Sequence, residues 1–282
     1  MQHEVISKCG GKRLKELSAQ SASGGPLFTL VTPVFNGEKR IESTILSVLS
    51  QTFSSFEYIV IDGGSTDGTL DLLRKYENVI DYWITEPDLG IYDAMNKAVG
   101  LARGQWLYFI GSDDTLCDSL DAVAQYLDDD RTVYYGNVFL TGSQKIYDGK
   151  FGPWKLSRRN ICQQAIFYPC CLFESEQFSL RYPVAADWEF NMRIYSNHNF
   201  RFQHIPVLVA NYDNFSGVSA VGPLDERFEC DKSSLIRRHL PAACYLLHRI
   251  RTIARATVYL ILRRPSGRNV SKSYPAKSGG VK

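Results

Sequence analysis

The sequence predicts an α/β fold in which a mostly parallel sheet is flanked by helices. Strand-like and helix-like segments alternate from residue 28 to residue 110, which is typical of parallel strands joined by right-handed crossovers. The run 105–110 is almost continuously apolar, as expected for a strand that is covered on both faces. With 282 residues, 44% of them hydrophobic, the chain is long enough to bury one large core.

The first half of the chain supplies the alternating pattern. Short apolar runs predict the strands, and apolar residues at helical spacing predict the helices between them. Turn-forming Gly, Asn, Asp and Pro residues separate these segments. The expected strands are 28–34, 56–61, 79–84 and 105–110. Two of the expected helices are 38–51 and 91–102, and a third is capped by Thr66 or Asp67 and runs to about Tyr76.

The second half has a mixed character. Strand-like and helical segments no longer alternate there, so we expect a mixed region beside the parallel half. Its expected strands are 133–140, 145–151, 165–168 and 200–211, and its expected helix is 187–195. The expected domain organisation is a flexible leader at 1–26, one domain at 27–220 with halves 27–115 and 116–220, a helical basic tail at 221–264 and a disordered end at 265–282.

Two adjacent carboxylates, Asp113 and Asp114, follow the apolar run 105–110. Open α/β sheets bind their ligands at the carboxyl ends of the strands. Adjacent carboxylates repel each other and are costly to desolvate unless a cation lies near them. Mg²⁺ or Mn²⁺ suits such oxygen ligands, often together with a substrate phosphate. The alternative is that Ser112 or Asp113 caps a helix beginning at Leu116. The SDD residues alone favour the helix cap, and their position after a buried strand makes the two interpretations about equal.

Several common site types are disfavoured by the sequence. The seven cysteines are scattered without CxxC spacing, which indicates neither a disulfide framework nor a zinc site and fits a reducing cytoplasm. The five histidines show no ligand spacing. No GxGxxG follows the first expected strand, and GxxxxGK[ST] is absent, so neither a dinucleotide site nor a P-loop is expected. The start of the chain lacks the apolar segment of a signal peptide.

The charge of the chain is strongly asymmetric. Twelve of the 32 Lys and Arg residues, and none of the 30 Asp and Glu residues, lie from Lys232 onward, which leaves 20 basic against 30 acidic residues in 1–231. A basic tail on an acidic body indicates a polyanionic partner, such as a membrane surface or a nucleic acid. Nucleic acid is the weaker candidate, because between Tyr245 and the expected disordered end the tail offers only Tyr259 for base stacking.

The segment 241–262 is predicted to be an amphipathic helix. Its basic residues interrupt the apolar sequence too often for a membrane span. We therefore expect this helix to lie in the interface of an anionic membrane, and the alternative is that it packs on the domain. Its apolar stripe is Leu246, Ile250, Ile253, Thr257 and Leu260, and the interrupting residues are Arg249, Arg251 and Arg255.

Four motifs, VTPVFNG, IDGGSTDGT, DLGIYDAMNKA and YFIGSDD, occur in this order over a region that extends through about residues 27–220. In order and spacing they resemble family 2 of the inverting glycosyltransferases, in particular bacterial enzymes that extend O-antigen, capsule or exopolysaccharide units. The resemblance implies a GT-A fold with a Rossmann-like sheet. It also implies a nucleotide-diphosphate sugar as donor and Mn²⁺ or Mg²⁺ as cofactor. The half 116–220 would form the acceptor side.

The resemblance assigns roles to residues at the ends of the expected strands. Pro33 and Phe35 match positions that line the nucleobase pocket, with Phe35 in place of the commoner Tyr. Asp62 matches the first acid after the second strand, but Gly63 replaces the acid that often follows and contacts uracil. Asp113 would lie near the ribose and the metal, and Asp114 would be the main metal ligand.

The stretch VAADWEFNMR at 184–193 resembles the acceptor-side helix of the family, whose aspartate is the usual general base. That residue is Asp187 here, and Ala186 replaces a preceding Glu of many relatives. The alternative is that Asp187 only caps the helix. Gln163 and Gln164 match a His-Gln pair of close relatives and are either acceptor contacts or a polar pair at a strand end. QxxRW, which marks processive synthases, is absent, so a single sugar transfer is expected.

These features together predict an inverting glycosyltransferase in surface polysaccharide biosynthesis, cytoplasmic and peripherally bound to the inner face of the cell membrane. Asp187 would take the proton of the acceptor hydroxyl, and a lipid-linked oligosaccharide is the expected acceptor. No nucleic acid partner is expected. The alternative is a degenerate member that binds nucleotide or glycan as a partner subunit, which Gly63 and Ala186 favour. The intact Asp113-Asp114 pair and Asp187 favour the enzyme.

Overall fold

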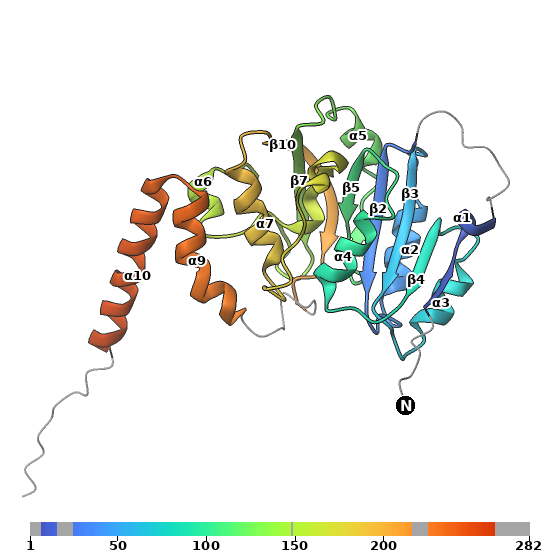
Figure 1. The fold of residues 1–282 in the computed structure, drawn as a ribbon, viewed down its shortest axis with the longest axis horizontal. Coiled ribbons are helices and arrows are strands. Elements are labelled where there is room, and N and C mark those ends of the chain that lie inside the picture. Colours follow the sequence, from blue (N-terminus) through green and yellow to red (C-terminus); the bar gives the residue numbers. More distant parts are fainter. Residues whose placement is uncertain (1–6, 16–24, 148, 216–224, 263–282) are drawn as a thin grey trace, which may run out of the picture.

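The structure is a computed structural model that describes residues 7–15, 25–147, 149–215 and 225–262. The expected disordered end at 265–282 lies outside the described residues, as do 1–6 and 16–24 of the expected leader. Figure 1 shows the sheet in the middle of the molecule and the two last helices at one end.

The described strands form one mixed sheet in the order β1-β4-β3-β2-β5-β9-β7-β10-β6, with β8 paired to β7. Its first half is parallel from β4 through β3 and β2 to β5, as the alternating pattern predicts. The β strands of this half are β2 (Phe28–Val34), β3 (Phe56–Asp62), β4 (Tyr82–Thr85) and β5 (Trp106–Phe109). The α/β fold with a mostly parallel sheet flanked by helices is therefore confirmed.

Helices cover both faces of the parallel half. Successive residues of β3 point to opposite faces, so Tyr58 packs in one apolar cluster and Ile59 in the other. The first cluster contains residues of α2 and α3, and the second contains residues of α4. The bounds are α2 (Ile41–Leu49), α3 (Thr69–Lys75) and α4 (Ile91–Val99).

The second half continues the sheet through β9, which is antiparallel to both β5 and β7. The helix considered from Leu116 does not begin there, because Leu116 belongs to β6 and pairs with Ala210 of β10. The elements are β6 (Thr115–Leu116), α5 (Leu120–Ala124), β7 (Thr132–Leu140), β8 (Lys145–Tyr147), α6 (Pro153–Leu156), β9 (Ile166–Pro169), α7 (Ala186–Tyr195) and β10 (Arg201–Tyr212), with 3₁₀ turns η1 (Gln163–Ala165) and η2 (Cys170–Glu174).

Part of the expected flexible leader is ordered. Residues Lys8–Gly10 form β1, which pairs antiparallel with β4 at the edge of the sheet, and Lys12–Lys15 form the short helix α1. Arg13 fixes this segment by donating to the backbone oxygen of Leu101 at 2.9 Å. The polar composition of the leader gave no sign of this, because the pairing uses backbone groups of an exposed sheet edge.

The last two helices differ in how they contact the body. Helix α9 (Glu226–His239) buries Phe228, Leu235 and Ile236 against the core, so the core continues past the expected boundary at residue 220. Helix α10 (Ala242–Leu262) buries Cys244 near its start, and its exposed residues include Leu246, Leu247, Ile250 and Ile253. Among the described helices, none is long and apolar enough to cross a membrane.

Candidate functional site

The motif residues meet where β2, β3 and β5 end. Asn36, just beyond β2, accepts a hydrogen bond from the backbone N–H of Thr66 at 2.9 Å, which ties the first motif to the second. Asn36 adopts a left-handed conformation with φ of 52°, and an asparagine tolerates this better than most residues. Pro33 lies buried within β2, and the side chain of Phe35 is 63% exposed beyond its end. Phe35 therefore offers an aromatic face to a ligand at this edge.

Asp62 is fully buried at the end of β3. Its Oδ2 accepts from the backbone N–H of Ser65 at 3.0 Å and from the hydroxyl of Thr85, and its Oδ1 accepts from the hydroxyl of Ser65. All of these donors belong to the chain itself, so the carboxylate organises the turn that follows β3. The sequence predicted Asp62 at this edge but not that its two oxygens would be used internally.

Asp114 is 1% exposed beyond the end of β5. Its Oδ2 accepts from Nε2 of Gln164 at 2.7 Å, and its Oδ1 accepts from the backbone N–H of Asp213 at 2.8 Å. Burial, and then the negative charge of Asp113, raises the pKa of Asp114 to about 8. A Cβ on Gly111 would lie 2.7 Å from Oδ2 of Asp114, so a glycine permits this close approach.

Asp113 is more exposed than its neighbour and faces Arg40. Nη1 of Arg40 lies 3.7 Å from Asp113 and 3.3 Å from Asp213. Burial raises the pKa of Asp113, and Arg40 opposes this effect. Neither Ser112 nor Asp113 caps a helix, because the next helix, α5, has Ser119 at its N-cap. The helix-cap interpretation of this motif is therefore wrong.

The donor set of the two aspartates fits a divalent cation that also binds a diphosphate. Within the described residues, no group of three or more His, Cys, Asp or Glu residues could hold a metal ion. Mg²⁺ and Mn²⁺ are, however, often held by one or two carboxylates together with substrate phosphate oxygens. Asp114 is almost fully buried beside the negative charge of Asp113, and both effects raise its pKa. A bound cation would offset this negative charge.

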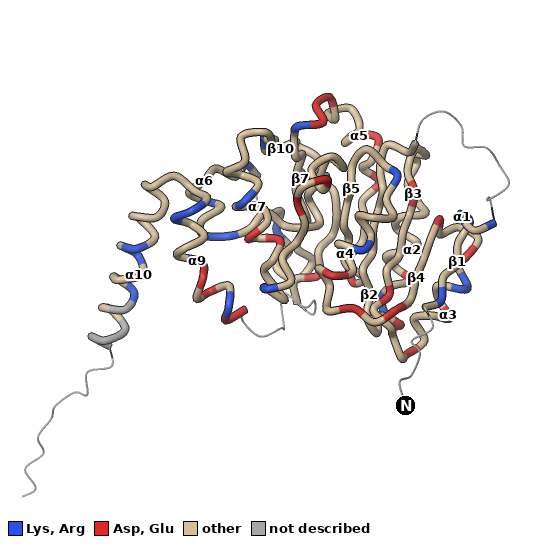
Figure 2. The backbone as a smooth tube through the Cα atoms, in the orientation of Figure 1, with Lys and Arg blue, Asp and Glu red and all other residues tan. Residues whose placement is uncertain are grey.

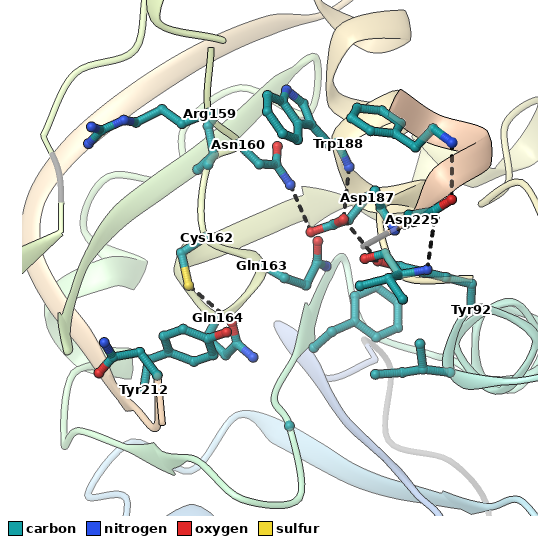
Figure 3. Close-up of a pocket in the computed structure, with 18 of the residues that line it drawn as sticks. Tyr92, Arg159, Asn160, Cys162, Gln163, Gln164, Asp187, Trp188, Tyr212 and Asp225 are labelled. Carbon is teal, nitrogen blue, oxygen red and sulfur yellow. Dashed lines mark hydrogen bonds between the residues drawn. The ribbon is translucent and has the colours of Figure 1, made fainter. Parts of the chain in front are cut away.

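Asp187 lies in the first turn of α7 and is held by three donors (Figure 3). Its Oδ1 accepts from the hydroxyl of Tyr92 and from the backbone N–H of Trp188, both at 2.9 Å. Its Oδ2 accepts from Nδ2 of Asn160 at 2.7 Å. Burial raises the pKa of Asp187 to about 6, although these donors favour the ionised form. A carboxylate with this pKa is suited to accept a proton near neutral pH.

A cavity of about 770 Å³ connects Asp187 with the diaspartate side. Gly111 and Gln164 line one part of it, and Asp187 and Trp188 line another. Figure 3 shows Gln164 and Asp187 in the same close-up, with Gln163 between them. Mostly apolar and aromatic walls complete the cavity, including Ile91, Tyr92, Met95, Phe109, Tyr147, Ile161, Val184, Tyr212 and Phe228.

The two glutamines have different environments. Gln164 holds Asp114, so its polar head is engaged by the chain. Gln163 is 8% exposed, its Oε1 lies 3.2 Å from the hydroxyl of Tyr168, and its Nε2 has no partner among the described residues. Asn160 is a site residue that sequence reasoning missed, because it stands in no motif and reaches Asp187 only through the packing of α7.

Comparison with known proteins identifies the family. The model described as Glycosyl transferase family 2 matches residues 29–207. The chain belongs to glycosyltransferase family 2. A PGL/p-HBAD biosynthesis glycosyltransferase of Mycobacterium tuberculosis (strain ATCC 25618 / H37Rv) is 38% identical over 205 residues, which cover 69% of this chain and 79% of the relative. The putative teichuronic acid biosynthesis glycosyltransferase TuaG of Bacillus subtilis (strain 168) is 40% identical over 92 residues, or 32% and 36% of the two chains.

Solved structures of glycosyltransferases share the fold of this family 2 chain. Staphylococcus aureus TarS 1–349 in complex with UDP-GlcNAc has a TM-score of 0.61 at 22% identity, covering 75% of this chain and 66% of that one. This chain spans 38% of the longer TarS structure, with a TM-score of 0.59 at 23% identity and 74% of this chain covered. The mannosyltransferase PcManGT of Pyrobaculum calidifontis, in complex with GDP-Man and Mn²⁺, has a TM-score of 0.53 at 18% identity. The match covers 81% of this chain and 65% of PcManGT. The GT-A fold is therefore confirmed.

Proposed function

We propose that this glycosyltransferase moves a single sugar from a nucleotide-diphosphate sugar to a saccharide acceptor, with inversion and with Asp187 as the general base. The observation that carries the proposal is that one cavity is lined by Asp187 and by Gln164, whose side-chain amide is bonded to Asp114. A donor whose diphosphate lies at the diaspartate would place its sugar in this cavity. The acceptor hydroxyl would then approach from the side of Asp187.

Asp187 would perform the proton transfer. Above a pH of about 6 it is mostly ionised and can accept the proton of the attacking hydroxyl. Among the described residues its Oδ2 receives only the Asn160 donor, which leaves a lone pair for the acceptor. Because Tyr92 and Trp188 both donate to Oδ1, the carboxylate is held in one orientation. Inverting transfer needs no covalent nucleophile.

The leaving diphosphate would be bound at the other side of the cavity. Asp114, with Asp113, would hold Mn²⁺ or Mg²⁺, and the metal when bound would neutralise charge on the diphosphate. Arg40, 3.7 Å from Asp113, adds positive charge at the same place. Phe35, which is exposed, would contact the nucleobase, and the buried Pro33 and Asp62 would shape the strand ends that frame the nucleoside. The complexes of TarS with UDP-GlcNAc and of PcManGT with GDP-Man and Mn²⁺ support this assignment.

The acceptor is proposed to be a lipid-linked oligosaccharide in surface polysaccharide biosynthesis. One relative is named for PGL/p-HBAD biosynthesis and another for teichuronic acid biosynthesis, and both names support a glycan product. Trp188, Phe228 and Tyr147 give the cavity aromatic walls, on which the apolar face of a sugar packs well.

Helix α10 would hold the enzyme on the inner face of the cell membrane. It exposes Ile250 and Ile253, more than half of each side chain, and carries Arg251 and Arg255 near them. In Figure 2 the described part of this helix shows basic positions, all of them arginines, and no acidic ones. An apolar stripe with basic flanks binds an anionic membrane through both its apolar surface and its charge. The alternative, in which the whole helix packs on the body, would leave no such exposed stripe.

The competing function is a degenerate partner subunit that binds nucleotide or glycan without turnover. Gly63 and Ala186, where relatives often have acids, favour it. The discriminating experiment measures donor binding by calorimetry with Mn²⁺, and then transfer to membrane-extracted acceptor with the same protein. If the protein is an enzyme, it should bind the donor in a metal-dependent way. It should also release nucleoside diphosphate only when an acceptor is present. Binding without turnover on any acceptor extract of the source cells would favour the partner subunit.

A further inference from the structure

A second group of charged side chains adjoins the cavity that contains Asp187. Arg158, from the loop after α6, and Glu229, from α9, both line this cavity. Nζ of Lys232, about one turn after Glu229 on α9, lies 3.3 Å from its carboxylate. The proton transfer and the metal site proposed above use none of these residues. The cavity therefore reaches charges whose role the transfer reaction itself does not explain.

Lys232 lies close to the proposed base. Its side chain is 13% exposed, and its Nζ lies 3.8 Å from the centre of the Trp188 ring and 5.5 Å from that of Phe228. Aromatic faces attract a cation at such distances, so the two rings hold the ammonium group in place. The backbone N–H of Trp188 also donates to Oδ1 of Asp187 at 2.9 Å. Trp188 thus contacts both the proposed base and the ammonium group of Lys232.

Helix α10 brings two arginines toward Lys232. Cys244 is buried near the start of α10 and marks the face that packs on the body. Arg251 and Arg255 lie on the same face about two and three turns later, at 3.6 residues per turn. Burial has the largest effect on the pKa of Lys232 and lowers it, and Glu229 opposes this effect. The charges of Arg251 and Arg255 lower this pKa further, so both arginines lie near Lys232.

Arg158 adds a further positive charge from the opposite direction in the sequence. The charge of Arg255 has the largest effect on the pKa of Arg251 and lowers it, and burial and the charge of Arg158 act in the same sense. Within the part of the chain that the structure describes, none of these three arginines is ion-paired with an acid. Arg158, Lys232, Arg251 and Arg255 are called the basic cluster below. Glu229 offsets its positive charge only in part, and a bound anion would offset it further.

The position of the basic cluster suits a phosphate group on the acceptor. Guanidinium groups bind phosphate oxygens through paired hydrogen bonds. Because Arg158 and Asp187 line one cavity, an anion held by the cluster can be joined to a sugar that lies beside the base. Ile250 and Ile253 are exposed on another face of α10 and would enter the boundary between headgroups and acyl chains. The cluster would then lie at the level where a membrane lipid carries its phosphate.

We propose that the basic cluster binds the phosphate or diphosphate group that joins the acceptor saccharide to its lipid, so that the acceptor is a phosphate-linked glycolipid and not a neutral one. This inference rests on the proposed function and names the linkage class of its acceptor. The cluster binds the acceptor and takes no part in the proton transfer. Arg158 and Lys232 lie outside α10, so their contribution can be measured while the proposed membrane anchor is intact.

The first test is calorimetric titration of inorganic pyrophosphate into the full chain in the presence of EDTA. Without a metal the diaspartate should repel this anion, so binding reports on the basic cluster. Arg158→Gln with Lys232→Gln should weaken binding about 10- to 100-fold, because hydrogen bonds to charged groups are lost. Arg74→Gln with Arg227→Gln is the matched control, at exposed positions of α3 and α9 that do not line the cavity, and should leave the affinity unchanged.

Melting temperatures of all variants are compared first, because Lys232 packs on two aromatic rings. If the double variant is unfolded, Arg158→Gln alone replaces it in both tests, since Arg158 is exposed. The single variant should still weaken pyrophosphate binding, by about 10-fold.

The second test distinguishes the phosphate of an acceptor from an ordinary anionic headgroup. Phosphatidylcholine vesicles are prepared with either a polyprenyl diphosphate or phosphatidylglycerol, at matched total charge, and co-sedimented with the protein in EDTA. The wild type should bind the diphosphate vesicles more tightly. Arg158→Gln with Lys232→Gln should lose this preference and keep its binding to phosphatidylglycerol vesicles, because α10 is unchanged.

Three results would each overturn the inference and leave the transferase proposal intact. They are undetectable pyrophosphate binding by the wild type, equal pyrophosphate affinity of the wild type and the double variant, and equal sedimentation of the wild type with both kinds of vesicle. The last result would assign the cluster to anionic headgroups in general. Failure of the wild type to bind any nucleotide sugar with Mn²⁺ would instead overturn the transferase proposal, whatever the pyrophosphate result.

Discussion

Asn160 donates its side-chain amide to Oδ2 of Asp187 at 2.7 Å, from a loop 27 residues earlier in the chain. The oxygen of the same amide accepts from Nδ2 of Asn191 at 2.9 Å, and the Oδ1 of Asn191 lies 3.0 Å from the hydroxyl of Tyr168. A series of hydrogen-bonded uncharged side chains thus positions the proposed base, where many relatives have an acid next to it. Position 186 could not supply that acid in this structure, because Ala186 is fully buried in the core.

Asn160→Ala should raise the pKa of Asp187 further, because the amide stabilises the ionised form and burial favours the protonated one. A base works only when ionised, so wild-type turnover should fall as the pH drops through about 6. In the variant this fall should begin at higher pH, and turnover should recover toward pH 8. The measurement is the pH profile of turnover, with Asn78→Ala, a surface amide bonded to Lys15, as control. A purely structural role for Asn160 predicts lower turnover with no shift of the profile, and that result would contradict the account.

Asp114→Asn should abolish metal-dependent donor binding, because the main proposed metal ligand is lost. It should also stabilise the metal-free protein at alkaline pH. The folded-state pKa of Asp114, about 8, lies above its unfolded value, so the folded state holds the proton more tightly and loses stability as the pH rises toward 8. Scanning calorimetry between pH 5 and 8.5 without metal measures this loss, which should be smaller in the variant. Unchanged metal-dependent affinity in the variant would remove Asp114 from the metal site.

Removal of residues 241–282 should release the protein from anionic vesicles while α9 and the body stay folded. Each basic group near such a surface contributes about 1 kcal/mol, and salt screens it. The full chain should therefore bind anionic vesicles better than neutral ones, with partial resistance to salt from the apolar stripe. Co-sedimentation measures the binding. Ile250→Asp with Ile253→Asp tests the stripe alone in the full chain, and Arg251→Gln with Arg255→Gln tests the charge alone. Equal sedimentation of the truncated protein would show that α10 is not the anchor.

The sequence predicted the features that local patterns determine. The parallel strands from β2 to β5 follow from short apolar runs, and the positions of Asp62, Asp114 and Asp187 at the ends or starts of elements follow from their motifs. Contacts between residues far apart in the sequence could not be predicted, because local patterns carry no information about tertiary packing. The bond between Gln164 and Asp114 joins residues 50 apart. Asp88 lies beside Gly63 because the loop after β4 is bonded to the end of β3. The strand β1 depends on backbone pairing, which side-chain composition does not record.

The central claim, that Asp187 is the base facing a nucleotide-sugar site, is tested most directly by Asp187→Asn. The account predicts donor affinity near that of the wild type, and turnover with an acceptor lowered by about 10²–10⁴, the usual contribution of a general base. Donor affinity is measured by calorimetry with Mn²⁺, and turnover by release of nucleoside diphosphate in the presence of acceptor. Asp121→Asn, an exposed position of α5 that does not line the cavity, is the matched control and should keep both donor affinity and turnover. Wild-type turnover by Asp187→Asn would contradict the account.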